Sequence, residues 1–173
     1  RASRDKAYMV ADQRFAAGRP DVLCFTTEPL AGDVTFAGGI RAVLQAAIST
    51  TDADFVVKLI DVWPDNTEYP GYQMLVRGDI MRGRYRRSFS APEPFTPGEP
   101  TEVAFTMPDI AHTFRKGHRI MVQVQSSWFP LADRNPQQFV DIYRCAASDF
   151  IPCDVRIYHD RRRPSRLEVL RLR

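Results

Sequence analysis

Three histidines are the side chains of this sequence that could act as a general base near neutral pH. A serine hydrolase of the α/β type places its nucleophile on a tight turn flanked by glycines, because larger side chains would clash there. None of the nine glycines stands two residues before a serine, so that motif is absent. A triad built without it would have to use His112, His118 or His159. No spacing pairs these with a serine, and we expect His112 and His118 to be structural and His159 to be exposed.

Metal chemistry has equally little support in the sequence. Cys145, Cys153 and His159 fall within fifteen residues of one another, but no C-x-x-C or H-x-x-x-H pattern accompanies them. A structural zinc ion needs four converging ligands, so we expect no metal and no cofactor. Cys145 and Cys153 could instead bridge a loop, which the sequence leaves open. Cys24 lies in an apolar run and is expected to be a small buried side chain.

An arginine-rich stretch could bind a polymer. Read as a strand, "RGRYRR" places Arg82, Arg84 and Arg86 on one face and Tyr85 and Arg87 on the other. Basic residues interleaved with an aromatic ring can follow a nucleic-acid strand. A solvated sheet face explains the pattern more simply, with some arginines paired to carboxylates such as Asp61, Asp79 or Glu93. We therefore expect no nucleic-acid partner.

Aromatic side chains offer a further binding chemistry. Trp63 and Trp128 could form a platform on which sugar rings stack, and Tyr72 could also serve in stacking. The chain would then be a carbohydrate-binding module. Packing in a core or against another surface explains each tryptophan as well. Trp63 is in phase with Phe55 and Leu59 along one predicted strand, which favours the core.

The stretch "QVQSSWFPLADRNPQ", residues 123–137, joins large apolar side chains directly to a polar turn. Asp133 and Asn135 can bond the backbone two residues further on and so fix the turn. Arg134 can form a bidentate pair with a carboxylate, and Trp128 and Phe129 can bury apolar area. This pattern is typical of a structured loop that docks against another surface.

Length and composition describe one globular domain without a membrane span. The chain has 173 residues, 44% hydrophobic and 26% charged, with a net charge of +3. It has no apolar run of the roughly 18 residues that would cross a bilayer and no signal peptide, and it opens without an initiator Met, which suggests a piece of something longer. Six arginines near the end are opposed by Glu168 alone, and we expect a solvated terminus there; they are Arg161, Arg162, Arg163, Arg166, Arg171 and Arg173.

Short strands must position these side chains. Period-two alternation, β-branched and aromatic residues and Pro/Gly/Asp turns predict nine or ten strands: 22–27, 34–38, 40–49, 54–64, 72–78, 79–89, 101–107, 119–129, 153–159 and 166–172. Two segments carry helical signals, one turn at 108–114 and an amphipathic pattern at 136–150. Strands and helices do not alternate regularly, so a parallel α/β sheet is disfavoured. The prediction is an all-β jelly-roll β-sandwich, with residues 1–19 as a loose lead-in and 20–173 as one domain.

Several short motifs of the sequence resemble those of a known family of hydrolases. The stretches "RPDVLCFTTEPL", "KLIDVWPD", "GYQMLVRG", "KGHR", "SSWFP" and "DRNPQ", in this order, are similar to the C-terminal domain of the X-Pro dipeptidyl-peptidase and cocaine esterase group. These motifs are most similar to those of the α-amino-acid ester hydrolase and glutaryl-7-aminocephalosporanic-acid acylase branch. The resemblance runs from about residue 12 to residue 172.

The resemblance implies what this domain does and what it lacks. In that family it is a galactose-binding-domain-like jelly roll that packs on an α/β-hydrolase domain earlier in the chain, which carries Ser, Asp and His. The resemblance therefore implies an enzyme as parent, a serine acylase, esterase or dipeptidyl-peptidase, and a fragment that is inactive alone. It implies no catalytic residue here, and the loop residues Trp128, Phe129, Asp133, Arg134 and Asn135 become candidates for docking and for shaping the neighbouring cleft. A homo-oligomer of the parent and its compartment, periplasmic, secreted or cytoplasmic, stay open.

Overall fold

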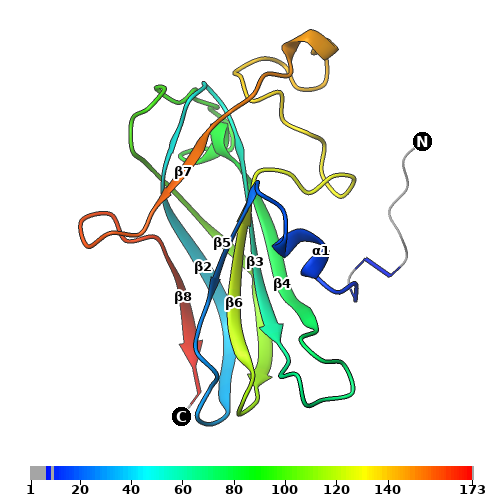
Figure 1. The fold of residues 1–173 in the computed structure, drawn as a ribbon. Coiled ribbons are helices and arrows are strands. Elements are labelled where there is room, and N and C mark those ends of the chain that lie inside the picture. Colours follow the sequence, from blue (N-terminus) through cyan, green and yellow to red (C-terminus); the bar gives the residue numbers. More distant parts are fainter. Residues whose placement is uncertain (1–6, 9, 173) are drawn as a thin grey trace.

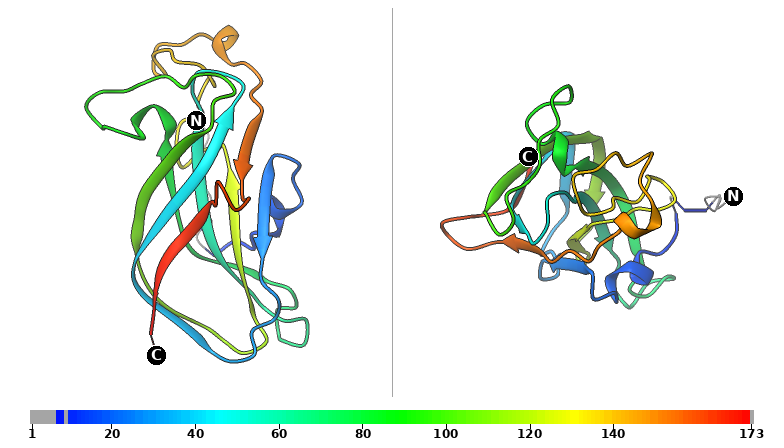
Figure 2. Two further views of the ribbon diagram at one scale, coloured as in Figure 1. Left: turned by 90° about the vertical axis from the view of Figure 1, so that its left-hand side faces the viewer. Right: turned by 90° about the horizontal axis from the view of Figure 1, so that it is seen from above.

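Strands form where apolar and polar side chains alternate, and they assemble into two antiparallel sheets that face each other (Figures 1 and 2). The structure is a computed structural model that describes residues 7–8 and 10–172. Within that part of the chain there are eight strands: β1 Val22–Thr26, β2 Val34–Ile48, β3 Asp54–Val62, β4 Gln73–Arg82, β5 Thr101–Phe114, β6 Arg119–Gln125, β7 Val155–Tyr158 and β8 Arg166–Arg171. One helical turn, α1 Arg14–Ala17, and two 3-10 turns, η1 Gly83–Tyr85 and η2 Ala147–Asp149, complete the elements.

The strands divide into a first sheet ordered β1-β6-β3-β4 and a second sheet ordered β5-β2-β7. The last strand, β8, pairs with β2 beside β7, so that β7 and β8 follow one another along the same edge of β2. Every pairing in both sheets is antiparallel. The all-β sandwich predicted from the sequence is confirmed.

The core lies between the sheets and is apolar. Phe55, Val57 and Leu59 of β3 point inward and pack with residues of β2 and β5, among them Ile40 and Phe105. Side chains in this core are less than a tenth exposed. A domain with a closed hydrophobic core of its own is expected to fold independently.

Two pairs of predicted strands are single strands in the structure. Segments 34–38 and 40–49 join as β2, because the register shifts between Gly38 and Ile40 while the strand continues. Gly38 has φ of 100°, a backbone angle that glycine adopts without strain, so the chain can bulge there instead of ending the strand. Segments 72–78 and 79–89 likewise share β4, which stops at Arg82 and gives way to η1.

The two helical predictions are wrong. Segment 108–114 is the second half of β5, which pairs with β2 alone and is therefore an edge strand that tolerates Pro108. Segment 136–150 contains only the 3-10 turn η2. The carbonyls of Gln138 and Val140, which a helix would use for its own bonds, accept hydrogen bonds from the Arg84 guanidinium instead.

The predicted lead-in 1–19 is partly outside the described residues, at positions 1–6 and 9. Its later part lies on the first sheet: Gln13 and Ala16 are buried, and the backbone nitrogen of Gln13 donates to the carbonyl of Gln73 at 3.0 Å. Because α1 is anchored in this way, that part is not a loose segment. The division at residue 19 otherwise stays a prediction.

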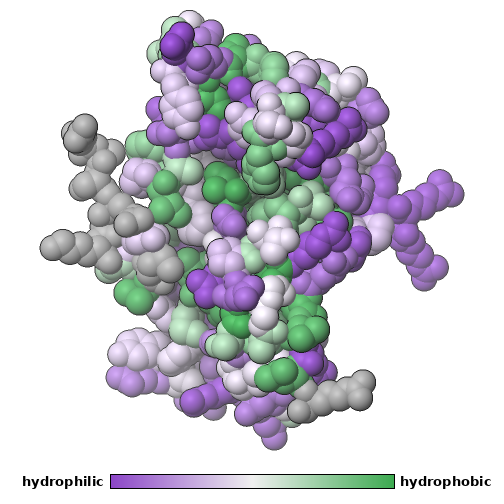
Figure 3. Space-filling model, turned by 180° about the vertical axis from the view of Figure 1, so that it is seen from behind, coloured by the Kyte–Doolittle hydropathy of each residue, from purple (hydrophilic) through white to green (hydrophobic). Residues whose placement is uncertain are grey.

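The connection between β7 and β8 stands away from the sandwich in Figure 1, and seen from behind in Figure 3 it is a hydrophilic projection. Arg161 and Arg162 are exposed there, and Arg163 bonds Asp160 at 3.2 Å. Further along, Glu168 pairs with Arg41 and Arg166 on the surface. These contacts fit the expected solvated terminus; Arg173 lies outside the described residues.

No helix in the described ranges has the length and apolar character that a bilayer crossing needs.

Candidate functional site

Two of the three histidines share one buried carboxylate, and neither forms a side-chain hydrogen bond with a serine of the described residues. His112 Nε2 lies 2.9 Å from Asp61 Oδ2, and His118 Nδ1 lies 2.8 Å from Asp61 Oδ1. His112 comes from β5, not from the turn expected, while Asp61 and His118 flank the same end of the first sheet. The group joins the two sheets through polar contacts, which is the structural role expected for both imidazoles.

The remaining candidates for chemistry are dispersed. His159 is exposed and contacts the Phe25 ring. All three cysteines are free, and Cys24 is exposed on β1, so the expectation that it is buried is wrong. β1 is an edge strand whose side chains at this position point to the outer face of the first sheet, away from the core. Within residues 7–8 and 10–172, no three His, Cys, Asp or Glu side chains come together in a way that could hold a metal ion.

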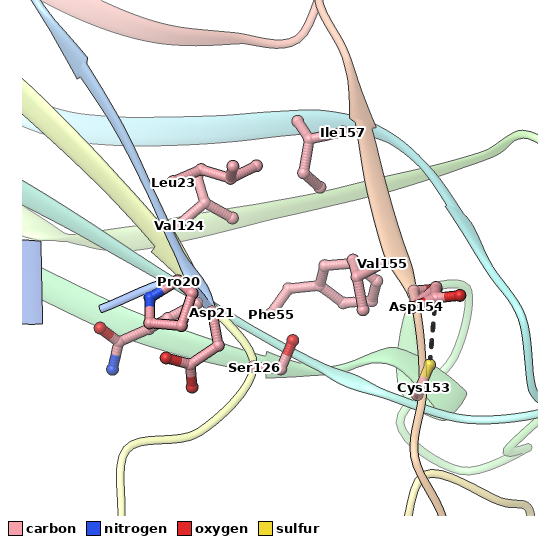
Figure 4. Close-up of a pocket in the computed structure, with 11 residues that line it drawn as sticks. Pro20, Asp21, Leu23, Phe55, Val124, Ser126, Cys153, Asp154, Val155 and Ile157 are labelled. Carbon is pink, nitrogen blue, oxygen red and sulfur yellow. Dashed lines mark hydrogen bonds between the residues drawn. The ribbon is translucent and has the colours of Figure 1, made fainter. Parts of the chain in front are cut away.

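A cavity of about 310 Å³ opens where β1 and β7, which belong to different sheets, lie opposite one another. Figure 4 shows Leu23 and Val124 on one side of it and Val155 and Ile157 on the other. Cys153 and Ser126 are the nucleophiles in its lining, and the Cys153 thiol accepts a hydrogen bond from Thr50. No imidazole or amine of the described residues lines this cavity to activate them, so it is not equipped for acyl transfer.

Arg82 and Arg84 of the arginine-rich stretch belong to a buried charge network, which corrects their assignment to a solvated strand face. Arg87 is exposed and pairs with Glu93 at 3.0 Å, as expected. Arg84 Nε and Nη2 bond Asp52 Oδ2 at 2.8 and 2.7 Å, and both side chains are buried. Arg82 Nε lies 3.4 Å from Asp54 Oδ1. Burial raises the pKa of Asp54 to about 6, and the bond from Asn135 opposes that shift. The chain leaves the sheet at η1 because the Arg84 backbone nitrogen also bonds Asp52.

Asn135 connects this network to the candidate docking loop. Its side-chain nitrogen donates to Asp52 at 2.9 Å and to Asp54 at 2.8 Å, and its Oδ1 accepts from the backbone nitrogen of Gln137 at 2.8 Å. The predicted turn bond of Asn135 is therefore confirmed. The carbonyl of Asp133 accepts from Arg82, so Asn135 and Asp133 hold the base of the loop to the sandwich.

The other three candidate residues belong to the same loop. Phe129 is 52% exposed. Arg134 is exposed, and its guanidinium lies over the rings of Phe129 and Phe150 at 5.6 and 5.2 Å. Trp128 is half-buried and points back to the sheet. The predicted group thus divides into an internal part, Asn135 and Trp128, and an outward part, Phe129 and Arg134.

A second cavity, of about 450 Å³, lies over the outer face of the first sheet between α1 and this loop. One row of residues crosses the sheet beneath it, from Cys24 through Gln123 and Lys58 to Gly78. The Trp128 ring lies on Gly78, where an added Cβ would come within 2.6 Å of it. Lys58 is among the residues that line the cavity, although the residue is only 1% exposed.

Sequence reasoning does not single out Lys58. Alternation along β3 places it simply on the face opposite the core, with Val56 and Ile60. A signal was available, because a strand that is apolar on both faces is buried on both. Lys58 therefore stands within an apolar layer, beside a cluster of Ile60, Leu75 and Met121.

The three aromatics proposed for sugar stacking do not form one platform. Trp63 packs edge-on against Tyr69 and Tyr72 at 6.0 and 5.7 Å and lies near His118, at the far end of β3. It is half-buried beside the core rather than in it. Trp128 covers Gly78 and Lys58 instead. Because Trp128 lies apart from the Trp63–Tyr72 pair, the two tryptophans do not form the shared platform that the carbohydrate-binding alternative invoked.

Comparison with known proteins adds the context that the geometry lacks. Residues 2–168 match the family described as X-Pro dipeptidyl-peptidase C-terminal non-catalytic domain. A curated relative is cocaine esterase from Rhodococcus sp. (strain MB1 Bresler), which is 44% identical over 125 residues. That alignment covers 72% of this chain and 21% of the relative.

Two solved structures are similar over almost the whole chain. One is an aminopeptidase from the marine sediment archaeon Thaumarchaeota archaeon, with a TM-score of 0.93 and 44% identity, covering 95% of this chain and 28% of that one. The other is an α-amino acid ester hydrolase, with a TM-score of 0.90 and 47% identity, covering 93% of this chain and 27% of that one. The chain thus spans about a quarter of the length of the proteins it matches.

Proposed function

Because the chain belongs to the family of X-Pro dipeptidyl-peptidase C-terminal non-catalytic domains, we propose that it is the non-catalytic β-sandwich of a serine acyl hydrolase. The parent would cleave esters, amides or X-Pro peptides in an α/β-hydrolase domain outside these residues. The supporting observation is the match itself: relatives named as an esterase, an ester hydrolase and an aminopeptidase extend well beyond this chain. The lack of a His–Ser side-chain bond among the described residues fits this division of labour.

We assign contact with the catalytic domain to the outward part of the loop after β6. Phe129 presents apolar area, and apolar surface removed from water stabilises by about 25 cal/mol per Å². Arg134 lies against Phe129 and is free to pair with a carboxylate of the other domain, since it forms no salt bridge within the described residues. Asn135 and Asp133 fix the loop from below, so that its outward side chains are presented in one arrangement. In this position the loop also shapes one wall of the neighbouring cleft.

Removing the two outward side chains from the full-length enzyme tests this assignment. The Phe129→Ala/Arg134→Ala variant is expected to lower the melting temperature of the full-length enzyme and its turnover, while the isolated sandwich melts nearly as before. Phe89→Ala serves as the matched control, because Phe89 is 81% exposed on a different loop. Unchanged melting and turnover in the double variant, or an effect of Phe89→Ala alone, would contradict the assignment.

The catalytic part of the proposal has a separate test. The 173-residue chain should not hydrolyse p-nitrophenyl esters, whereas the full-length protein should do so through a serine in its preceding domain. Hydrolysis by this chain that a single serine substitution abolishes would overturn the proposal.

A further inference from the structure

Lys58 is a buried cation that no anion of the described residues balances. Its Nζ donates one hydrogen bond, to Gln13 Oε1 at 2.9 Å. Nζ also lies 5.1 Å from the centre of the Trp128 ring and 5.6 Å from that of Phe15, while Gln123 and Gly78 stand beside Lys58 on the two neighbouring strands. No carboxylate in the described part of the chain lies within salt-bridge distance of it. An ammonium group carries three donors, so Lys58 retains unused capacity.

The buried arginine Arg84 has a different environment. Arg84 is paired with Asp52 and has backbone carbonyls for its remaining donors. The chain contains only three lysines, Lys6, Lys58 and Lys116, among its 24 basic residues. A lysine ammonium is a compact charge that suits one anion, while an arginine suits planar, bidentate contacts. Lys58, which lies inside the apolar layer, therefore differs from Arg84 in having no carboxylate partner among the described residues.

The cavity above Lys58 has the size and lining of a ligand site. Its volume of about 450 Å³ falls within the roughly 300–1,000 Å³ of small-molecule pockets. Its walls are mainly apolar, with Phe15, Leu75 and Trp128 among them, and no Asp or Glu of the described residues lines it. Polar groups at the wall, such as Gln125, whose Oε1 is buried without a partner, can orient a bound molecule.

We propose that this cavity binds a small carboxylate with an apolar or aromatic body, whose charge pairs with the Lys58 ammonium. The body lies against Trp128 and Phe15, and the carboxylate takes the donors that Gln13 leaves unused. Phe129 of the candidate docking loop also lines this cavity, so in the full-length enzyme the site would lie beside the proposed domain contact. The proposal itself needs only residues of this domain and does not rest on the acyl hydrolase activity of the parent.

The charge of Lys58 makes the binding depend on pH. Burial, with a smaller contribution from the positive charge of Arg19, lowers the pKa of Lys58 to about 8. The ionisable groups around it are Arg19, which is paired with Asp21 at 2.8 Å, the Cys24 thiol and the Tyr8 phenol. A bound anion favours the protonated amine, so affinity should be highest near pH 7 and fall as the pH rises past 8.

Titration of the 173-residue chain with phenylacetate tests the proposal, since its closed core supports folding on its own. Heats of binding and the indole N–H resonances in NMR spectra are the readouts. Binding should shift the Trp128 resonance and leave that of Trp63, at the far end of β3, in place. Phenylacetamide, which has the same shape without the charge, should bind at least tenfold more weakly, and phenylacetate itself should bind at least tenfold more weakly at pH 9.5 than at pH 7.

Two variants of Lys58 test whether binding requires its amine. Lys58→Met should weaken phenylacetate binding at least tenfold, with Lys58→Gln as a second variant of similar length, while Lys116→Met, at an exposed position, should bind like the unmodified chain. Equal binding of the acid and the amide, unchanged binding in either Lys58 variant, or no binding at pH 7 would overturn the proposal. Failure here would leave the parent's assignment as an acyl hydrolase intact, because that rests on separate experiments.

Discussion

Replacing Lys58 by methionine should stabilise the domain at neutral pH, which is unusual for a change inside a packed layer. The pKa of Lys58 is lowered from 10.5 to about 8 in the folded chain, and a tenfold change in a protonation equilibrium corresponds to about 1.4 kcal/mol. Holding the protonated amine in place therefore costs the folded state about 3 kcal/mol at pH 7. Methionine has similar length and no charge, so Lys58→Met should raise the free energy of unfolding by up to that amount, less the lost contact with Gln13.

The pH dependence of this difference is the decisive measurement. A lysine whose folded pKa is lowered contributes its full stability only above its unfolded pKa of 10.5 and loses it as the pH falls through 8. The advantage of Lys58→Met should therefore be largest below pH 8 and shrink toward zero by pH 10.5. Urea unfolding, followed by tryptophan fluorescence at pH 7 and at pH 9.5, measures both values.

A matched substitution separates charge burial from a general effect of removing a lysine. Lys116→Met removes the same group from an exposed position and should change the free energy of unfolding by no more than about 0.5 kcal/mol. The reasoning is refuted if Lys58→Met destabilises the domain at pH 7, or if its effect is the same at both pH values. Either result would mean that the contacts with Gln13 and the aromatic rings outweigh the cost of burying the charge.

Three further changes test other parts of the fold. Asp61→Asn removes the charge that two imidazoles share and should cost about 3 kcal/mol in urea unfolding, and an unchanged midpoint would show that the cluster is not stabilising. The pKa of Asp54 is raised to about 6. Its stabilising contribution is therefore complete below about pH 4 and is lost as the pH rises through 6. Relative to Asp54→Asn, the free energy of unfolding of the unmodified chain should increase by up to about 3 kcal/mol between pH 7 and pH 4. Gly78→Ala places a Cβ against the Trp128 ring and should cost about 1–3 kcal/mol and alter tryptophan fluorescence, whereas Gly32→Ala, which meets nothing within 4 Å, should do neither.

The strands were predictable where the two faces of the chain differ. β6 alternates apolar and polar residues over much of its length, and its position follows from that period. β3 is the exception, because it is buried on both faces and was placed by its β-branched and aromatic residues. The union of two predicted segments in β2 was not predictable in this way, because a glycine pair reads equally well as a turn or as a bulge. The period of 136–150 suits a helix, yet the segment is irregular because Arg84, distant in the sequence, takes its carbonyls.

The candidate docking loop could be found from its composition, but its internal division could not. Nothing in the sequence tells that Asn135 lies inside and Phe129 outside, since both are close to the polar turn. That division depends on two aspartates about eighty residues earlier in the chain, Asp52 and Asp54, which bond Asn135. Long-range pairing of polar side chains is what sequence periodicity does not record.

Two of the buried polar groups on the first sheet, the network around Asp52 and the lysine Lys58, differ in charge balance, and this difference separates structural from binding roles. In the network around Asp52, two carboxylates face two guanidinium groups and an amide, so the charges are matched inside the fold. Breaking such a network costs stability, but because its charges are already paired it does not indicate a binding site. Lys58 has no matching charge among the described residues, and a fold that keeps an unmatched charge in an apolar layer forgoes stability that methionine would supply. An anion from outside the domain would remove that cost, and the cavity that Lys58 lines is the position at which we propose that it binds.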